Sequence, residues 1–109
     1  MTVNESYERF LQERITELRT QKGASARDMS LTIGQCVSYI NTIENKKSLP
    51  SMRVFFYICE YFGITPMEFF DEYNEHPQML KELIEDLKQL DENSLAHIAG
   101  LAKELKKKK

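Results

Sequence analysis

The sequence has no long apolar run. Its longest uninterrupted apolar stretch, residues 54–59, contains six residues, whereas a membrane-spanning helix needs roughly 18 or more. The first residues also lack the basic and apolar regions of a secretory signal. We therefore expect no membrane-spanning segment and a cytoplasmic location.

Cysteine and histidine are scarce, with two of each in the chain. Cys36, Cys59, His76 and His97 show none of the paired spacings that place metal ligands next to one another. The sequence therefore predicts no metal and no cofactor. In the cytoplasm, both cysteines are expected to be reduced thiols.

Glycine and proline are also few, with four and three among 109 residues, while 41% of the residues are hydrophobic. This composition argues against a disordered chain, a collagen-like repeat and a small disulfide-rich scaffold. The length leaves no room for a two-domain enzyme built around a cleft. Because no motif arranges a nucleophile, a base and an orienting group, we do not expect an enzyme.

An excess of positive charge, the usual first sign of nucleic-acid binding, is missing as well. The net charge is −2, from 15 basic and 17 acidic residues. The charge is unevenly placed, because residues 19–53 hold six basic and two acidic residues, whereas residues 54–73 hold four acidic and no basic ones. The acidic total therefore suggests an oriented charge distribution and does not exclude a nucleic-acid partner.

Apolar residues recur at steps of three and four along nearly the whole chain, which predicts an all-α fold. Five helices are expected in the first part, over residues 5–22, 26–33, 35–45, 52–62 and 66–70. Residues suited to capping precede three of them, namely Ser25, Ser51 and Thr65. Glycines interrupt or end the pattern at Gly23, Gly34 and Gly63. A cluster of seven aromatic residues is expected to form part of the core, in preference to a platform on which bases stack: Phe55, Phe56, Tyr57, Tyr61, Phe62, Phe69 and Phe70.

The composition shifts after Asp71. The sequence predicts a first domain over residues 1–73, a linker at 74–77 and a helical extension over 78–109. The extension is expected to form two amphipathic helices, the second of them capped by Asp91. Their apolar stripes need a partner, and either the first domain or a second chain can supply it.

Two short helices joined by a tight turn at Gly34, within a set of five short helices, match the helix-turn-helix plan. The second helix of such a pair fits the major groove of B-DNA. From about Phe10 to Asp71 the sequence resembles the Cro/CI-type (XRE) helix-turn-helix regulators. The resemblance is carried by residues 15–19, 23–25, 33–34, 39–47, 49–51 and 62–70. The stretch 43–70 is similar to small regulators of Gram-positive bacteria.

The resemblance implies that residues 35–45 form the recognition helix and that Val37, Ser38 and Thr42 read bases. Helical periodicity gives a separate indication. With Ile40 and Ile43 facing inward, the outward positions include Ser38, Asn41 and Thr42, and Val37 lies on the flank. We therefore expect base reading by Val37, Ser38, Asn41 and Thr42, the alternative being that they are simply solvated.

Phosphate contacts are expected around the start of the second helix and the loop after the third. The expected residues are Ser25, Ala26, Arg27, Gln35, Asn45, Lys46, Lys47 and Ser48. Taken alone, each lysine or arginine among them is more often a solvated surface residue than a phosphate contact. The resemblance also implies an ion pair between Arg19 and Glu44 that orients one helix on another.

Two departures from the family's pattern occur near the start of helices. Ala26 stands where the family commonly has glutamine, and Gln35 and Cys36 stand where an aliphatic residue and a serine cap are usual. A thiol caps poorly, so the start of the recognition helix is expected to be looser. Cys36 has two interpretations, a redox-reactive thiol at a helix start or, as we favour, an inert side chain behind Ile40.

The resemblance favours a homodimer on a pseudo-palindromic site of double-stranded DNA. The expected dimerisation residues are Leu83, Leu87, Leu95, Ile98, Gly100, Ala102 and Leu105. We therefore expect a dimeric, sequence-specific DNA-binding regulator, and specifically a repressor. The alternative is a protein-interaction module, an antitoxin-like or adaptor subunit, that has a helix-turn-helix fold. The sequence does not identify a small-molecule effector.

Overall fold

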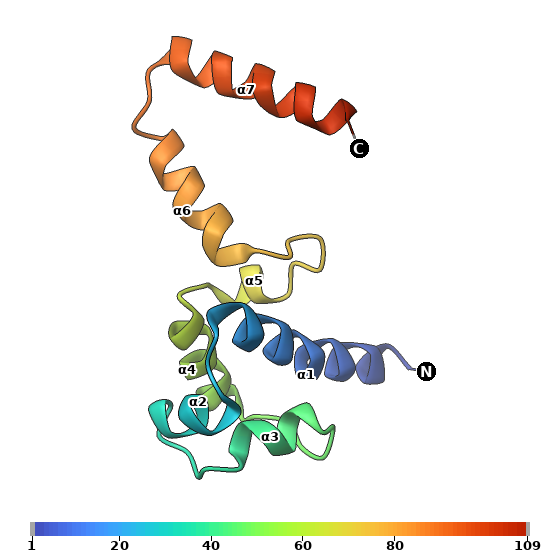
Figure 1. Cartoon of the computed structure of the whole chain (residues 1–109). Helices are drawn as coiled ribbons and strands as arrows, with labels where there is room; N and C mark the ends of the chain where they lie inside the picture. Colours follow the sequence, from blue (N-terminus) through green and yellow to red (C-terminus); the bar gives the residue numbers. More distant parts are fainter. Residues whose placement is uncertain (1, 109) are drawn as a thin grey trace. The chain divides into compact units, whose positions relative to one another are not determined.

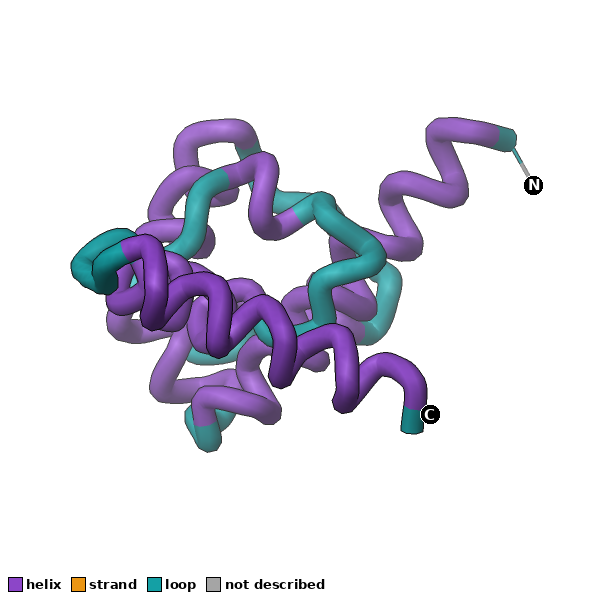
Figure 2. The backbone as a smooth tube through the Cα atoms, turned by 90° about the horizontal axis from the view of Figure 1, so that it is seen from above, coloured by secondary structure: helices purple, strands orange, loops and turns teal. Residues whose placement is uncertain are grey.

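The computed structural model describes residues 2–108, and within them the chain forms seven helices (Figure 1). They are α1 (Val3–Lys22), α2 (Ala26–Thr32), α3 (Tyr39–Glu44), α4 (Met52–Phe62), α5 (Pro66–Phe69), α6 (Pro77–Leu87) and α7 (Glu92–Lys107). The described residues contain no strand, and Figure 2 shows helices joined by loops. The prediction of an all-α fold is confirmed. The chain divides into two compact units, Met1–Gln78 and Met79–Lys109.

Side-chain caps set the helix starts of the first unit. Ser25, Ser51 and Thr65 each accept a hydrogen bond from the amide three residues later, at 3.0, 3.2 and 3.1 Å, as the sequence predicts. α1 begins two residues earlier than expected, because Thr2 and Glu5 form a reciprocal capping box. Among the described residues, no helix combines the length and apolar character needed to cross a membrane.

The core of the first unit is formed by apolar side chains from α1 to α5 and the turns between them. Its buried members are Ile15, Leu18, Met29, Ile33, Ile40, Ile43, Phe55, Ile58, Cys59, Phe62, Ile64 and Phe69. The rings of Phe55 and Phe69 meet edge to face with centroids 5.0 Å apart, a favoured arrangement. Burial also raises the pKa of the Cys59 thiol to about 11, so this thiol stays protonated at neutral pH.

The aromatic cluster that the sequence places in the core is only partly buried. Phe55, Phe62 and Phe69 are buried, whereas Phe56 and Phe70 are about half exposed, at 51% and 41%. Neighbouring residues on a helix point in directions about 100° apart. A continuous aromatic run therefore cannot bury every ring in one core.

Arg14 is a charged residue of the core that the sequence analysis did not identify. It is 3% exposed. Its Nε donates to the Phe69 carbonyl at 2.9 Å, and its Nη2 donates to the Asn74 carbonyl at 2.6 Å. The last carbonyls of a helix have no partner within the helix, so the guanidinium of Arg14 satisfies carbonyls at the end of α5 and in the loop beyond it.

The linker predicted at residues 74–77 is wrong in part. Pro77 is fully buried and is the first residue of α6, and the boundary between the compact units follows Gln78. Arg14 holds Asn74, and the Gln21 side chain donates to the Glu75 carbonyl at 2.6 Å. Both contacts join residues more than fifty positions apart, so local composition gives no sign of them.

In the second unit, Met79–Lys109, α7 starts at the predicted cap, where Asp91 accepts a hydrogen bond from the Ser94 amide at 2.8 Å. This bond lowers the pKa of the Asp91 carboxyl. No described residue of this unit is buried. The apolar stripes of its helices therefore remain accessible to water.

Candidate nucleic-acid interface

The turn after α2 is built on Gly34. Its φ of 77° lies in the left-handed region, which glycine adopts without the steric cost of a Cβ. The Gly34 amide donates to the Leu31 carbonyl at 3.0 Å, and the Gln35 amide donates to the Ser30 carbonyl at 2.9 Å. This pair of bonds is the Schellman ending of α2, and it turns the chain toward α3.

Ser30 connects α2 to the start of α3. Its buried hydroxyl donates to the Ala26 carbonyl at 2.7 Å and accepts a hydrogen bond from the Ile40 amide at 3.0 Å. Ile40 is the second residue of α3, and such an amide has no acceptor within its own helix. The residue at the N-cap position, Ser38, makes no side-chain capping bond. Ser30 therefore caps α3 from another helix, a role that the sequence analysis missed.

The predicted recognition helix over residues 35–45 begins too early. The helix runs over Tyr39–Glu44, and residues 35–38 form the turn before it. Neither Gln35 nor Cys36 supplies a capping bond, and the Gln35 side chain donates to the Ile33 carbonyl at 3.4 Å. Because the cap comes from Ser30, the helix starts only where its amides can reach that hydroxyl.

Cys36 lies in this turn and is exposed, with its Sγ 3.7 Å from the Ser38 Oγ. The expectation that its side chain is packed behind Ile40 is therefore wrong. That expectation assumed that residue 36 belongs to the helix, and the later start of α3 removes the basis for it.

The residues expected to read bases lie in the turn and in α3. Val37, Ser38 and Asn41 are exposed, whereas Thr42 is partly buried. The Thr42 hydroxyl donates to the Ser38 carbonyl at 2.8 Å. Its oxygen can still accept a hydrogen bond, but its proton is already engaged. The exposed groups thus combine an aliphatic side chain, a hydroxyl and an amide.

The end of α3 repeats the ending of α2 with a lysine in place of glycine. The Lys46 amide donates to the Ile43 carbonyl at 2.9 Å, and the Lys47 amide donates to the Thr42 carbonyl at 3.1 Å. Lys46 has a φ of 65°, the one positive value among the described residues other than glycine. A side chain in this conformation costs free energy that glycine avoids.

The other expected phosphate contacts lie at the two ends of the α2–α3 pair. Ser25 caps α2, Ala26 is partly buried and Arg27 is exposed. After α3, the side chains of Asn45, Lys46, Lys47 and Ser48 are exposed. The buried Gln12 donates to the Ser48 carbonyl at 3.1 Å and so holds this loop against α1.

Arg19 and Glu44 form a bidentate ion pair between α1 and the last residue of α3. Arg19 Nε lies 2.7 Å from one Glu44 oxygen, and its Nη2 lies 2.9 Å from the other. The remaining Nη1 donates to the Ala24 carbonyl at 2.9 Å. The hydrogen bond to Glu44 raises the pKa of Arg19 above its usual value, because it favours the charged form.

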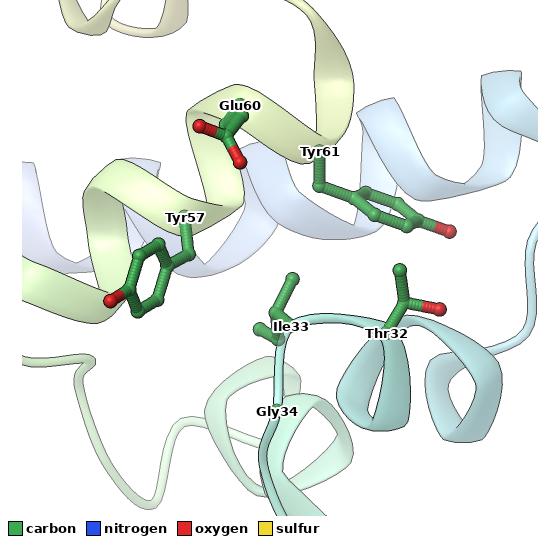
Figure 3. Close-up of a pocket in the computed structure, with 6 residues that line it drawn as sticks. All are labelled: Thr32, Ile33, Gly34, Tyr57, Glu60 and Tyr61. Carbon is green, nitrogen blue, oxygen red and sulfur yellow. The ribbon is translucent and has the colours of Figure 1, made fainter.

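A hollow of about 310 Å³ lies between the turn and α4 (Figure 3). Its lining residues are Thr32, Ile33, Gly34, Tyr57, Glu60 and Tyr61. The one charged side chain among these six is the carboxylate of Glu60, which disfavours a phosphate group. The hollow is therefore chemically distinct from the basic residues around the turn and the end of α3.

Comparison with known families agrees with this geometry. A model of a helix-turn-helix domain matches residues 12–75, which is more than half of the chain. The match starts within α1 and ends after α5, so it includes α2, the Gly34 turn and α3. Neither a curated protein nor a solved structure matches the chain.

Replacing Ser30 with alanine tests its role as the cap of α3. Ser30→Ala leaves the buried Ile40 amide without an acceptor, and we expect the free energy of unfolding to fall by about 1–3 kcal/mol. Urea unfolding measures this change. Thr32→Val is a matched control, because Thr32 donates to the carbonyl four residues earlier as Ser30 does but accepts no bond from α3. Equal losses for the two variants would contradict the capping role.

Proposed function

The chain belongs to the helix-turn-helix domain family, and we propose that it is a sequence-specific regulator of transcription that reads double-stranded DNA with the turn before α3 and α3 itself. The observation that carries this proposal is the fixed presentation of exposed short side chains at the start of α3, next to exposed lysines at its end. Ser30 holds the first turn of α3, and Arg19 holds its last residue.

The side chains at this surface match the groups that the major groove displays. Val37 can contact a thymine methyl group, and Asn41 can form two hydrogen bonds with an adenine edge. Ser38 can donate to or accept from a base, whereas Thr42 can accept. These four residues are the proposed base readers.

The phosphate contacts fix the position of the protein on the duplex without selecting a sequence. The proposed contacts are Ser25, Ala26, Arg27, Gln35, Asn45, Lys46, Lys47 and Ser48. Because residues 19–53 hold six basic and two acidic residues while the rest of the first unit is net acidic, this face is the favoured one for an anionic duplex. The modest charge predicts modest affinity for non-specific DNA.

A two-fold dimer adds the contacts of a second copy. We propose that two copies bind half-sites about one helical turn, roughly 34 Å, apart, and that the complex represses transcription in the manner of Cro/CI-type regulators. The second unit supplies the dimer contacts through its apolar stripe: Leu83, Leu87, Leu95, Ile98, Ala102 and Leu105. Gly100 is left out, because it is two residues from both Ile98 and Ala102 and so faces the other side of α7.

Selection of bound sequences from random duplex DNA tests the proposed function. We expect a pseudo-palindromic site, bound more tightly than non-specific DNA and with affinity that falls steeply between about 50 and 200 mM salt. Failure to enrich any sequence would contradict the proposal. It would favour an interaction module with the same fold.

The base-reading assignment predicts a selective loss of affinity. Val37→Ala with Thr42→Ala should weaken binding to the selected site by about tenfold or more and leave non-specific binding nearly unchanged, because only base contacts are removed. Fluorescence anisotropy on both kinds of duplex measures the effect. Val3→Ala with Thr20→Ala is the matched control, since both residues are exposed on α1. Equal losses on the two duplexes would show that the pair does not read bases.

Lys46→Gly separates the stability of the loop from its contact with DNA. Glycine removes the cost of the positive φ, so we expect the free energy of unfolding to rise by up to about 1 kcal/mol. Loss of one phosphate contact should weaken binding to all sequences alike and reduce the salt slope by about one. Urea unfolding measures the change in stability, and a salt titration of DNA binding measures the change in slope. Lys88→Gln is the control, because it removes a lysine charge outside the proposed phosphate contacts. An unchanged salt slope would remove Lys46 from the interface.

A further inference from the structure

The second unit consists of α7 and the part of α6 that follows Gln78, and none of its described residues is buried. The large apolar residues remain substantially exposed: Met79 66%, Leu80 42%, Leu83 49%, Ile84 43%, Leu90 37%, Leu95 39%, Ile98 38%, Leu101 58% and Leu105 56%. Helices of 11 and 16 residues are only marginally stable in water on their own and gain stability by packing an apolar face. These faces therefore need a covering surface.

The apolar residues of each helix form one stripe. In α6 the residues Leu80, Leu83, Ile84 and Leu87 recur at steps of three and four, which places them on one side. In α7 the same spacing joins Leu95, Ile98, Ala102 and Leu105. α6 and α7 do not fully bury these stripes against each other, since Leu87 is partly buried and the other large apolar residues in them are 38–56% exposed.

The two halves of the unit carry opposite charge. α6 holds one basic and three acidic residues, a net charge of −2, whereas α7 holds three basic and two acidic residues, a net charge of +1. Packing α6 against a second α6 brings two net negative helices together, and packing α7 against a second α7 brings two net positive helices together. Packing α6 against an α7 places unlike charges side by side, which favours that pairing.

We propose that two copies of this chain exchange helices, so that α6 of each copy packs against α7 of its partner. This arrangement covers both apolar stripes, pairs helices of opposite net charge and repeats each contact twice about a two-fold axis. The four helices form a bundle of the kind that stabilises short amphipathic helices. The inference rests on the dimeric regulator proposed above and adds the partner surface and the way the helices pair.

Sedimentation equilibrium of the full chain without DNA tests the pairing through the sign of its salt dependence. We expect a dimer whose dissociation constant rises several-fold between about 0.05 and 0.5 M salt, because salt screens attraction between unlike charges. Packing of like helices predicts the opposite, since salt then screens repulsion. A monomer at every concentration, with the stripes covered by the same chain, would also overturn the proposal.

Cross-linking of mixed chains, in which the introduced cysteine is the only exposed one and the native Cys59 stays buried, tests the exchange directly and keeps both apolar stripes intact. In a Cys36→Ser background, one chain carries Asp86→Cys in α6 and a second, isotopically heavy chain carries His97→Cys in α7. A short bismaleimide should give mainly the mixed dimer, which mass spectrometry distinguishes from the two homodimers. A majority of homodimers, or no cross-linked dimer, would contradict the exchange.

Gly100→Ala is the matched control for both measurements. Its added methyl group meets nothing within 4 Å, and the residue faces away from the apolar stripe. We expect this variant to keep the dimer, whereas Ile98→Asp should lower association at least tenfold, since it places a charge in the stripe. Equal association of these two variants would contradict the proposed contact.

The tests separate this inference from the proposed function. A chain that exchanges helices but selects no DNA sequence would contradict the function alone. A chain that selects a DNA site but sediments as a monomer would contradict the pairing alone.

Discussion

The ion pair between Arg19 and Glu44 fixes the position of the helix on which the candidate interface depends. α3 has only six residues, too few for a helix to be stable in isolation. Its orientation therefore comes from tertiary contacts, which are the burial of Ile40 and Ile43 in the core and the contacts at its two ends. Arg19 holds the last residue of α3 with two charge-assisted bonds and also binds the Ala24 carbonyl between α1 and α2. Ser30 holds the first turn.

Local signals predicted much of the fold. Ser25, Ser51 and Thr65 cap the helices that they precede, and glycines with positive φ follow α1, α2 and α4. These features depend on neighbouring residues and can therefore be predicted from the sequence. The start of α3 is different, because its cap comes from Ser30, ten positions before Ile40. Arg14 likewise acts on carbonyls more than fifty positions away, so spacing and composition could not identify its role.

The candidate site also combines features that the sequence predicted with features that it could not predict. The sequence placed the expected readers in one helix over residues 35–45, whereas Val37 and Ser38 lie in the turn before α3. It also could not predict that the Thr42 hydroxyl is already bonded to the Ser38 carbonyl. Lys46 adds a second case, since a lysine in a glycine-like conformation is evident only from the backbone. Charge also divides by region: Glu60, the one acidic residue of α4, lines the hollow, whereas Lys46 and Lys47 follow the end of α3.

A double-mutant cycle on Arg19 and Glu44, read out as affinity for the selected DNA site, tests the central claim most directly. We expect Arg19→Met and Glu44→Gln each to weaken specific binding by about tenfold, and the double variant to be little worse than either, with a coupling free energy of about 1–3 kcal/mol. This result would mean that the pair positions α3 as one element. Additive losses, or unchanged affinity in folded variants, would contradict the claim that this ion pair sets the DNA-reading geometry.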